Sequence, residues 1–224
     1  MSATHHQNLS VPLLFLCLLG ASLCVPQHSH ASDWNFFGWG KKVTGSGVHQ
    51  TENRAVSGYR SVKLAGSFDV NIVQDGNEGI TIHAEDNVLP LIATDVERGD
   101  LIIKWRERNL SVSHKKVTIT VHAKDIEAVS VAGSGSIQAD AIKSPRLKTS
   151  IAGSGDIRIN NLSAGALKVS ISGSGDFTAA GTADEFEASI AGSGAFKTER
   201  LKTKRRQRSN LANIRRIDKE FHDA

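Results

Sequence analysis

One stretch decides the fold of this chain: Thr149-Ser-Ile-Ala-Gly-Ser-Gly-Asp-Ile-Arg-Ile159. Its central Gly-Ser-Gly occurs four times, and successive copies are separated by 20, 20 and 19 residues. A fixed period of this length is typical of a repeat architecture, in which each copy packs on its neighbours. The glycines of the four copies are Gly133, Gly135, Gly153, Gly155, Gly173, Gly175, Gly192 and Gly194.

The residues on either side of each Gly-Ser-Gly alternate between apolar and polar. This period of two predicts strands with one buried face. Two short strands bury little surface alone, but copies stacked about 4.8 Å apart would align their apolar residues in continuous columns. The sequence therefore predicts an all-β fold, a parallel β-helix (β-solenoid) with coils of about 20 residues, within a domain of residues 45–199. A degenerate copy, Val62-Lys-Leu-Ala-Gly-Ser-Phe-Asp-Val70, places the first coil near residue 56 and implies an insertion before Gly133.

The glycines have a mechanical role in such a corner, because glycine adopts positive φ without Cβ strain. The functional alternative is a phosphate cradle, but a P-loop needs a lysine after its last glycine, and no copy has one. An aspartate follows only two copies, as Asp156 and Asp176, whereas a calcium-binding β-roll repeats every few residues with a regular aspartate. We therefore interpret the eight glycines as structural turns and expect no metal or other cofactor.

Residues 1–31 are predicted to be a secretory signal peptide. Residues 11–25 are apolar but too short for a membrane span, and Ser29-His-Ala31 provides small residues before a cleavage site. The segment departs from the usual pattern because no Lys or Arg precedes the apolar run. We expect an exported protein, in the periplasm or at the cell surface.

Both cysteines of the chain, Cys17 and Cys24, fall in this predicted leader. Each is preceded by leucine rather than the small residue of a lipoprotein signal, which disfavours lipidation. The mature chain would hold no cysteine, which excludes disulfides, thiol catalysis and cysteine-bound zinc.

Residues 32–44 form an aromatic segment that includes Trp34, Phe36, Phe37 and Trp39. It would either cover the open end of the first coil or offer an aromatic patch to a sugar or protein partner. In the insertion, alternation predicts strands at 80–84, 101–105 and 117–122, with a turn at Arg98-Gly-Asp100.

Residues 200–224 differ in composition from the repeat. They hold nine of the 27 Lys and Arg residues, so the formal net charge of +4 comes from this segment. Leu211, Ile214, Ile217 and Phe221 have helical spacing, which predicts a short amphipathic helix that caps the last coil. The alternatives are a disordered tail, a basic surface that touches an anionic membrane, or a frameshifted or truncated end, because alternation is lost from Lys202 onward.

An ordered set of motifs makes the chain similar to a known family. The motifs are Gly45-Ser-Gly47, Thr51-Glu-Asn-Arg-Ala-Val-Ser-Gly-Tyr59, Val62-Lys-Leu-Ala-Gly-Ser-Phe-Asp-Val-Asn-Ile72, Ala84-Glu-Asp-Asn-Val-Leu-Pro90, Gly99-Asp-Leu-Ile-Ile103 and the Gly-Ser-Gly coils. Over residues 45–199 the chain resembles the putative auto-transporter adhesin head GIN domain family (DUF2807). The resemblance implies a secreted bacterial β-helix with a role in adhesion, and it supplies no catalytic residues.

Two classes of function fit these observations. The first is a non-enzymatic envelope or surface protein that binds a glycan or a protein through a long solenoid face, or itself through exposed solenoid ends. The expected binding residues point outward on that face and are Arg158, Asn160, Lys168, Ser170, Thr178 and Lys197. Export makes nucleic acid an unsuitable partner, and contact of the basic tail with a membrane stays open.

The second class is a polysaccharide-degrading β-helix enzyme. Asp156 and Asp176 would stack on adjacent coils at the spacing of a carboxylate pair in a retaining glycosidase. Both follow a glycine turn, however, where aspartate commonly accepts backbone hydrogen bonds. We therefore favour a non-enzymatic protein.

Overall fold

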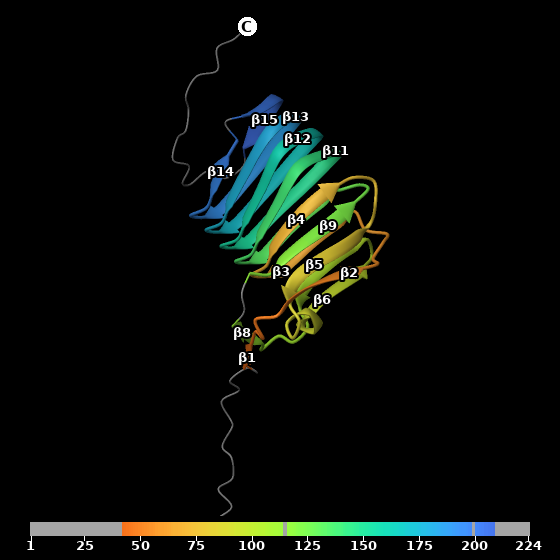
Figure 1. Ribbon diagram of the computed structural model, residues 1–224. Helices are drawn as coiled ribbons and strands as arrows, with labels where there is room; N and C mark the ends of the chain where they lie inside the picture. Colours follow the sequence, from red (N-terminus) through yellow and green to blue (C-terminus); the bar gives the residue numbers. More distant parts are fainter. Residues whose placement is uncertain (1–41, 114–115, 199, 209–224) are drawn as a thin grey trace, which may run out of the picture. The chain divides into compact units, whose positions relative to one another are not determined.

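The computed structural model describes residues 42–113, 116–198 and 200–208 (Figure 1). These residues form an all-β domain built on a strongly curled open sheet, which confirms the predicted class. A single 3-10 turn, η1 (Leu89–Leu91), accompanies the strands, and the described ranges contain no α-helix. The predicted signal peptide, most of the aromatic segment and the predicted helix near residues 211–221 lie outside the described residues.

The sheet contains short strands near the N-terminus and long ones after residue 135. The strands are β1 (Lys42–Thr44), β2 (His49–Arg54), β3 (Ser61–Gly66), β4 (Asp69–Gln74), β5 (Gly79–Glu85), β6 (Ile92–Glu97), β7 (Asp100–Trp105), β8 (Ser111–Ser113), β9 (Thr118–Ala123), β10 (Ala128–Gly133), β11 (Ser136–Gly153), β12 (Asp156–Gly173), β13 (Asp176–Gly192), β14 (Ala195–Lys197) and β15 (Leu201–Arg208). β1 and β8 form a separate parallel pair, and the other thirteen strands belong to one sheet.

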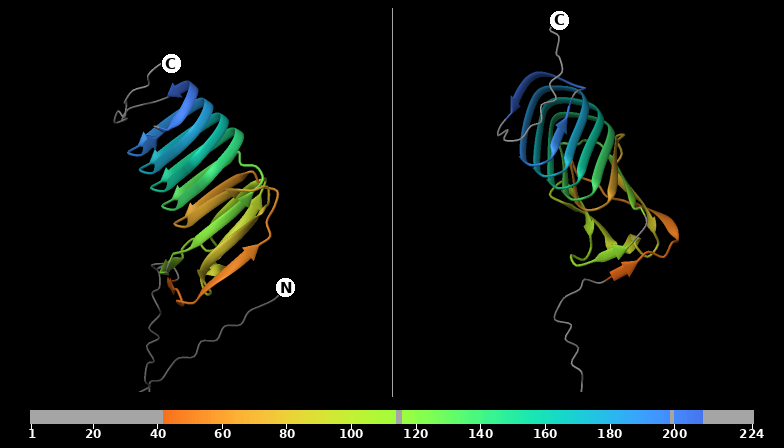
Figure 2. Two further views of the ribbon diagram at one scale, coloured as in Figure 1. Left: turned by 45° about the horizontal axis from the view of Figure 1, so that its top comes forward. Right: turned by 90° about the vertical axis from the view of Figure 1, so that its left-hand side faces the viewer.

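The Gly-Ser-Gly copies organise the regular part of the sheet, and we call the chain from one copy to the next a coil. β11, β12 and β13 run parallel, and residues of β11 pair with those 20 positions later in β12, as Ile137 does with Ile157. The pairing of β11 with β12 is interrupted at Asp140 and Pro145, so each long strand consists of three straighter segments joined by bends. Figure 2 shows how these strands curl in parallel with one another.

The shorter third repeat has a defined place in this register. Ile159 pairs with Ala179, but Leu162 pairs with Gly181, so β13 has one residue fewer at the first bend. Gly181 has φ of +121°, and a Cβ there would lie 2.1 Å from the Leu162 carbonyl oxygen. The chain therefore shortens the coil by one residue and restores the register within the same bend.

The two glycines of each copy meet different requirements. The first, such as Gly173 with φ of +129°, has a backbone conformation that side chains rarely adopt. The second has no such φ, but a Cβ on Gly175 would lie 2.0 Å from the Gly155 carbonyl oxygen. Across the eight glycines, the nearest atom to an added Cβ is a backbone oxygen of the preceding coil, at 2.0 to 2.8 Å. The corners of successive coils therefore stack backbone on backbone.

Inward side chains of successive coils lie in apolar columns. Val70, Ile137, Ile157 and Phe177 form one column, and each is at most 2% exposed. In the column Val129–Thr149–Val169, the Thr149 hydroxyl is buried without a hydrogen-bond partner. The stack is therefore held mainly by apolar burial, which contributes about 1.5 to 3 kcal/mol for each large side chain.

The degenerate first copy and the insertion complete the N-terminal end. β3 pairs in register with β10, and β4 pairs with β11, as the early copy predicts. On one side β9 pairs in parallel with β4, and β5 and then β2 follow in antiparallel pairs. On the other side β7 pairs in parallel with β3, and β6 follows in an antiparallel pair. All of these strands except β2 belong to the insertion. Arg54 of β2 links the two edges, because its guanidinium donates to the carbonyl oxygens of Ile92 at 2.7 Å and Leu89 at 2.9 Å.

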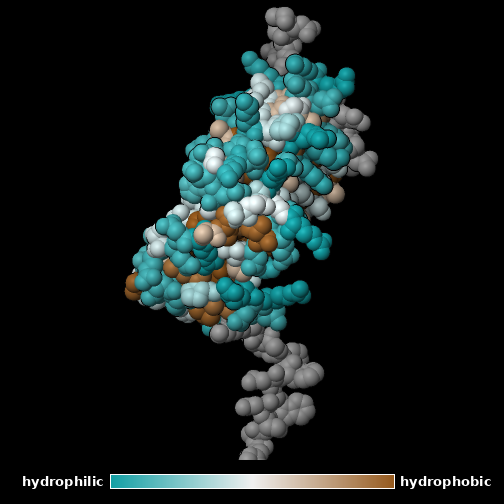
Figure 3. All heavy atoms as spheres, turned by 90° about the vertical axis from the view of Figure 1, so that its right-hand side faces the viewer, coloured by the Kyte–Doolittle hydropathy of each residue, from teal (hydrophilic) through white to brown (hydrophobic). Residues whose placement is uncertain are grey.

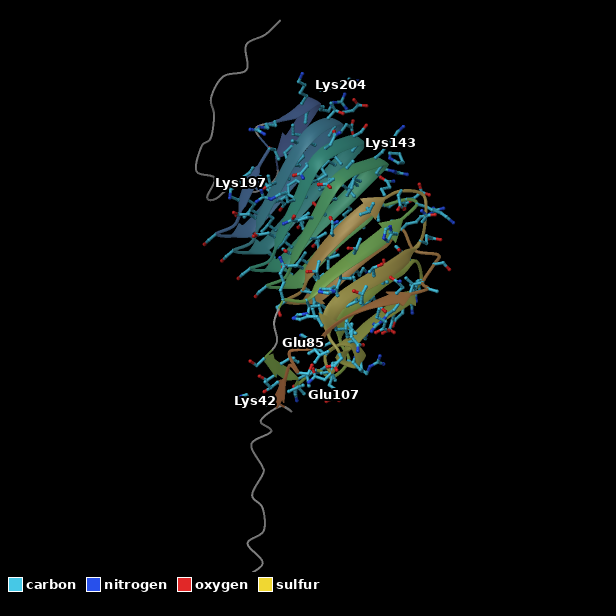
Figure 4. All side chains as sticks on the ribbon, viewed as in Figure 1. Lys42, Glu85, Glu107, Lys143, Lys197 and Lys204 are labelled. Atoms are coloured by element: carbon cyan, nitrogen blue, oxygen red, sulfur yellow. The ribbon has the colours of Figure 1, made fainter. Side chains whose placement is uncertain are left out.

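A hydrogen-bonded loop holds the start of the domain. The Gly47 N–H donates to the carboxylate of the buried Glu85 at 2.8 Å, and Asn87 donates to the Thr44 carbonyl oxygen at 2.8 Å. Figure 4 places Glu85 at the end of the sheet near β1 and β8. These contacts join two motifs on which the family resemblance rests.

The stack continues beyond the predicted end at Glu199. β15 pairs in parallel with β13, so residues 201–208 add a strand where the sequence predicted that the repeat had ended. Leu201 points inward and is 1% exposed, whereas Lys204 and Arg205 point outward and pair with Asp184 at 2.9 Å and Glu185 at 3.1 Å. Ion pairs to the preceding coil accommodate the basic residues, so their abundance does not end the sheet.

Candidate binding groove

The structure separates the six predicted binding residues into two groups. Lys168 and Ser170 lie on the segment of β12 that leads into a turn. The other four follow a turn, and three of them form one in-register column: Arg158, Thr178 and Lys197. Figure 4 places Lys197 at the opposite edge of the coils from Lys143 and Lys204. The six residues therefore do not form one site.

The two aspartates considered for catalysis form part of the stack. An oxygen of Asp156 accepts the Asp176 N–H at 2.9 Å, and an oxygen of Asp176 accepts the Ala195 N–H at 3.1 Å. Lys197 contacts the other oxygen of Asp176 at 2.7 Å, and this ion pair raises the pKa of Lys197. Asp69 occupies the same column and accepts the Ser136 hydroxyl at 2.6 Å. This column of oxygens has a structural explanation, because it binds each coil to the next.

A groove with charged walls crosses the strands on the side that carries Lys168. It consists of two adjoining hollows of about 540 and 900 Å³, and both are lined by Glu127 and Lys148. We call it the charged groove. Its larger hollow reaches the turn between β6 and β7, and its smaller hollow reaches Arg205 of β15.

Five cations of the charged groove are paired with acidic groups. The pairs are Arg60–Glu127 at 3.3 Å, Lys63–Asp100 at 2.5 Å, Lys124–Glu78 at 3.4 Å, Lys168–Glu187 at 2.8 Å and Arg205–Glu185 at 3.1 Å. The ammonium group of Lys63 lowers the pKa of Asp100, which keeps that carboxylate ionised. Within the described ranges, Arg98, Arg146 and Lys148 line the groove without an ion pair or side-chain hydrogen bond. Among the residues that the structure describes, the groove therefore offers three cations without a salt-bridge partner, beside one carboxylate of the larger hollow, Asp125, that has no such partner either.

The backbone holds one of these cations in an unusual conformation. Arg98 and Gly99 form the two-residue turn of the β6–β7 hairpin, with φ of +52° and +83°. Arg98 is the one residue other than glycine with positive φ in the described part of the chain. Turns of this kind favour asparagine or glycine, because the left-handed region is strained for other residues. The Gly99 carbonyl oxygen accepts the Arg60 N–H at 2.9 Å, which fixes the turn against the groove.

The described residues contain no group of three or more His, Cys, Asp or Glu side chains that could hold a metal ion. The histidines of the insertion make local contacts instead. His122 contacts Asp75 at 2.8 Å, and His83 contacts Thr51 at 3.0 Å. The hydrogen bond from His122 lowers the pKa of Asp75.

The surface offers little apolar area to a partner. Val48 is the one large apolar side chain that is strongly exposed within the described ranges, at 54%. On the side drawn in Figure 3, hydrophilic side chains dominate the upper coils, and apolar atoms gather mainly in the lower half. The described surface therefore presents mainly polar and charged side chains, and strongly exposed large apolar ones are rare on it.

A family model extends over most of this architecture. The model described as putative auto-transporter adhesin, head GIN domain (DUF2807), matches residues 58–208, from the turn before β3 to the end of β15. The chain belongs to this family. The match includes β15, in agreement with the extra strand that the structure places after Glu199.

Solved structures of similar fold come from Bacteroides and Parabacteroides species. A putative adhesin from Bacteroides fragilis has a TM-score of 0.68 and 21% identity, over 74% of this chain and 78% of that one. A putative lipid binding protein from Parabacteroides distasonis has a TM-score of 0.62 and 22% identity, over 75% and 80%. A putative adhesin from Parabacteroides merdae has a TM-score of 0.60 and 20% identity, over 75% and 79%. No match is found among curated proteins.

Sequence reasoning missed most of the head GIN domain's groove. The 20-residue period places Lys148 one coil before Lys168, so the repeat pattern alone could have identified Lys148. Arg146 directly follows the bend at Pro145, which the period alone does not reveal. Arg98 belongs to the insertion, and its place beside the coils depends on the pairing of β7 with β3.

Proposed function

We propose that this head GIN domain is an exported, non-enzymatic binding protein that holds an extended partner along the outer face of a parallel β-solenoid. The observation that carries the proposal is the charged groove, which runs across parallel strands from the β6–β7 turn to β15. Regular stacking repeats similar outward groups at each strand, which suits a partner that is itself extended. The family and its adhesin neighbours agree with a binding role.

The groove lining favours a glycan over a protein partner. The centres of protein interfaces are depleted in charged residues and enriched in aromatic ones. The charged groove has charged residues along its length, and its aromatic lining residues, Tyr59 and Phe186, are buried. Ser130 of β10 and Ser150 of β11 line it as well, and hydroxyl groups such as theirs suit the hydroxyl groups of a sugar chain.

Export is supported by the sequence pattern of residues 1–31. Among the described residues, no helix is long and apolar enough to cross a membrane. We place the mature protein in the periplasm or at the cell surface.

Lipid binding and polysaccharide cleavage are less well supported. The name of the Parabacteroides distasonis protein refers to lipid, but in this chain the columns inside the curled sheet are filled by apolar side chains, and both hollows of the groove lie outside them. For cleavage, Asp156 and Asp176 already bind backbone N–H groups.

A retention assay with product analysis tests the proposed function. The purified full chain would be incubated with peptidoglycan, lipopolysaccharide and capsule-type glycans, and bound protein and released fragments would both be measured. We expect retention on at least one glycan without fragments. Fragment release that the double variant Asp156→Asn/Asp176→Asn abolishes would establish an enzyme instead. If a parallel panel of surface proteins retained the chain and no glycan did, the partner would be a protein and not a glycan.

A further inference from the structure

The unpaired cations of the charged groove lie too far apart to share one small anion. Arg98 precedes β7, which pairs with β3, then β10, then β11 with Lys148. Three strand spacings of about 4.8 Å correspond to roughly 14 Å. Lys148 lines both hollows, and Arg146 continues into the smaller one. A ligand that uses all three cations must therefore be a chain.

The space between these cations is polar. Ser130 and Ser150 line the larger hollow between the β6–β7 turn and Lys148. Ser130 and Ser150 are register partners, so their positions repeat at the spacing of neighbouring strands. Hydroxyl groups both donate and accept hydrogen bonds, which suits the hydroxyl-rich backbone of a polysaccharide.

The turn that carries Arg98 gives independent support. An asparagine at this position would relieve the left-handed strain at no cost to the hairpin, yet the chain has an arginine. Strained residues cluster at ligand contacts, where the side chain has a use that offsets the strain. Arg98 lines the groove, where a cationic side chain has such a use.

The acidic residues of the groove limit the charge density of the ligand. Glu78, Asp100, Asp125 and Glu127 all line the larger hollow. Duplex DNA carries one negative charge in about 1.7 Å of its length, so these carboxylates would repel it along its whole contact. An anionic glycan carries fewer charges, separated by neutral hydroxyl groups. It can place its anions at the cations and its hydroxyl groups near the carboxylates.

We propose that the charged groove binds an anionic glycan, and that Arg98, Arg146 and Lys148 contact its carboxylate or sulfate groups. This inference rests on the proposed function and specifies the ligand of the same groove. Guanidinium groups bind such anions through two parallel hydrogen bonds, so the two arginines would give the larger part of the selectivity.

The test compares polymers that differ in charge. Binding of the purified full chain to alginate, which carries carboxylates, to dextran sulfate and to uncharged dextran would be measured at low and near-physiological salt. The triple variant Arg98→Asn/Arg146→Gln/Lys148→Gln removes the unpaired cations. Lys143→Gln removes one exposed cation of β11 outside the groove and is the control. Circular dichroism and thermal unfolding would verify that both variants fold.

We expect the wild-type protein to bind alginate or dextran sulfate and not uncharged dextran. Its affinity for the charged polymer should fall as the salt concentration increases. The triple variant should lose about tenfold or more in affinity, because each exposed charged contact contributes a few-fold. The Lys143→Gln variant should bind as the wild type does. A preference between alginate and dextran sulfate would identify which anionic group the groove selects.

Other outcomes overturn the inference in distinguishable ways. Equal binding by the triple variant would place the anion site elsewhere, and binding of neither charged polymer would exclude an anionic glycan. Retention on uncharged glycans alone would contradict the inference but leave the proposed function intact. Duplex DNA would be added to the same assay. If it bound as well as the charged glycans or better, the carboxylates of the groove would not limit the charge density of the ligand, and the choice of a glycan would be wrong. Released fragments would overturn the proposed function itself.

Discussion

The regular coils of residues 128–208 and the N-terminal part of residues 42–127 build one sheet by different means. In the coils, the strands pair in parallel along most of their length, and glycine corners stack directly on one another. In the N-terminal part, short strands in both parallel and antiparallel pairs extend the sheet, and individual side chains such as Arg54 hold the edges together. The coils therefore tolerate change poorly at repeated backbone positions, and the N-terminal part tolerates it poorly at single polar side chains. The charged groove uses both, because Arg98 comes from one part and Arg146 and Lys148 from the other.

The largest effect is expected from a side chain in a glycine corner. Gly175→Ala would place Cβ 2.0 Å from the Gly155 carbonyl oxygen, so two coils must move apart. We expect a loss of about 3 to 5 kcal/mol in the free energy of unfolding, measured with urea. Gly47→Ala is the control, since nothing lies within 4 Å of its Cβ and only its φ of +81° is unfavourable, at about 1 to 2 kcal/mol. Equal losses would mean that the corners are not held by close backbone contact.

A smaller loss is expected when Arg54 is replaced in the N-terminal part. Arg54→Met keeps the length of this largely buried side chain but removes its donors to Ile92 and Leu89. The loss should be about 2 to 3 kcal/mol, because hydrogen bonds to a charged group are stronger than neutral ones. Arg60→Met removes one exposed ion pair and should cost at most about 1 kcal/mol. If both variants unfold at the same urea concentration, Arg54 does not join the two edges.

A gain in stability is expected at one position of the coils. Thr149→Val replaces a buried hydroxyl without a partner by a methyl group of similar volume, between Val129 and Val169. The free energy of unfolding should rise by about 1 kcal/mol, because an unsatisfied buried hydroxyl is unfavourable. The same change at Thr178, which is partly exposed, should have no comparable effect. A destabilised Thr149→Val protein would indicate that the hydroxyl has a partner.

Replacing Arg98 by asparagine should raise the stability of the protein and lower its affinity for the glycan. Arg98→Asn relieves the left-handed strain at φ of +52° and should raise the free energy of unfolding by up to about 1 kcal/mol. The same variant should bind the anionic glycan more weakly. Denaturant unfolding and a titration with alginate or dextran sulfate measure the two effects. A variant that is less stable would show that the arginine contributes to the fold itself.

The smallest expected effect is a loss of stability of the N-terminal part at low pH. The pKa values of Asp75 and Asp100 are lowered by His122 and Lys63, so the folded state binds these protons less readily than the unfolded chain. Their contribution to stability is present above the ordinary aspartate pKa of about 4 and is lost as the pH falls through the lowered value. Both residues belong to the N-terminal part. Hydrogen exchange at about pH 3 should therefore show weaker protection there than at about pH 6, and a change confined to β11–β13 would contradict this.

The sequence predicts the coils because their stabilising pattern is local and repeated. The period gives the all-β class, the corners and the columns from residues that are close in the chain. The N-terminal topology depends on pairs such as His49 with Glu85, which no short pattern reveals. The sequence pattern does not predict β15, because no Gly-Ser-Gly marks this strand and most of its outward residues are basic. The strand is held instead by its pairing with β13, by the buried Leu201 and by ion pairs such as Lys204–Asp184.

The candidate site is less predictable than the fold for the same reason. The repeat places Lys168 on an outward face, but the charged groove exists only where the hairpin of β6 and β7 lies beside the coils. Residues 98 and 146 are placed in one groove by three strand pairings, β7 with β3, β3 with β10 and β10 with β11, and not by any spacing in the sequence. Which cations stay unpaired also depends on acidic neighbours from other strands, such as Asp100 for Lys63.

The short bend at Gly181 has a consequence for changes in chain length. At the Gly-Ser-Gly corner each residue touches its counterpart in the preceding coil, so an added or deleted residue would break contacts along the stack. The bend after Ile159 already absorbs such a change, because β13 lacks one residue there and pairs correctly on both sides. This bend is therefore the point at which coils of unequal length can be joined, and a natural position for inserting a loop or a label without disturbing the columns inside.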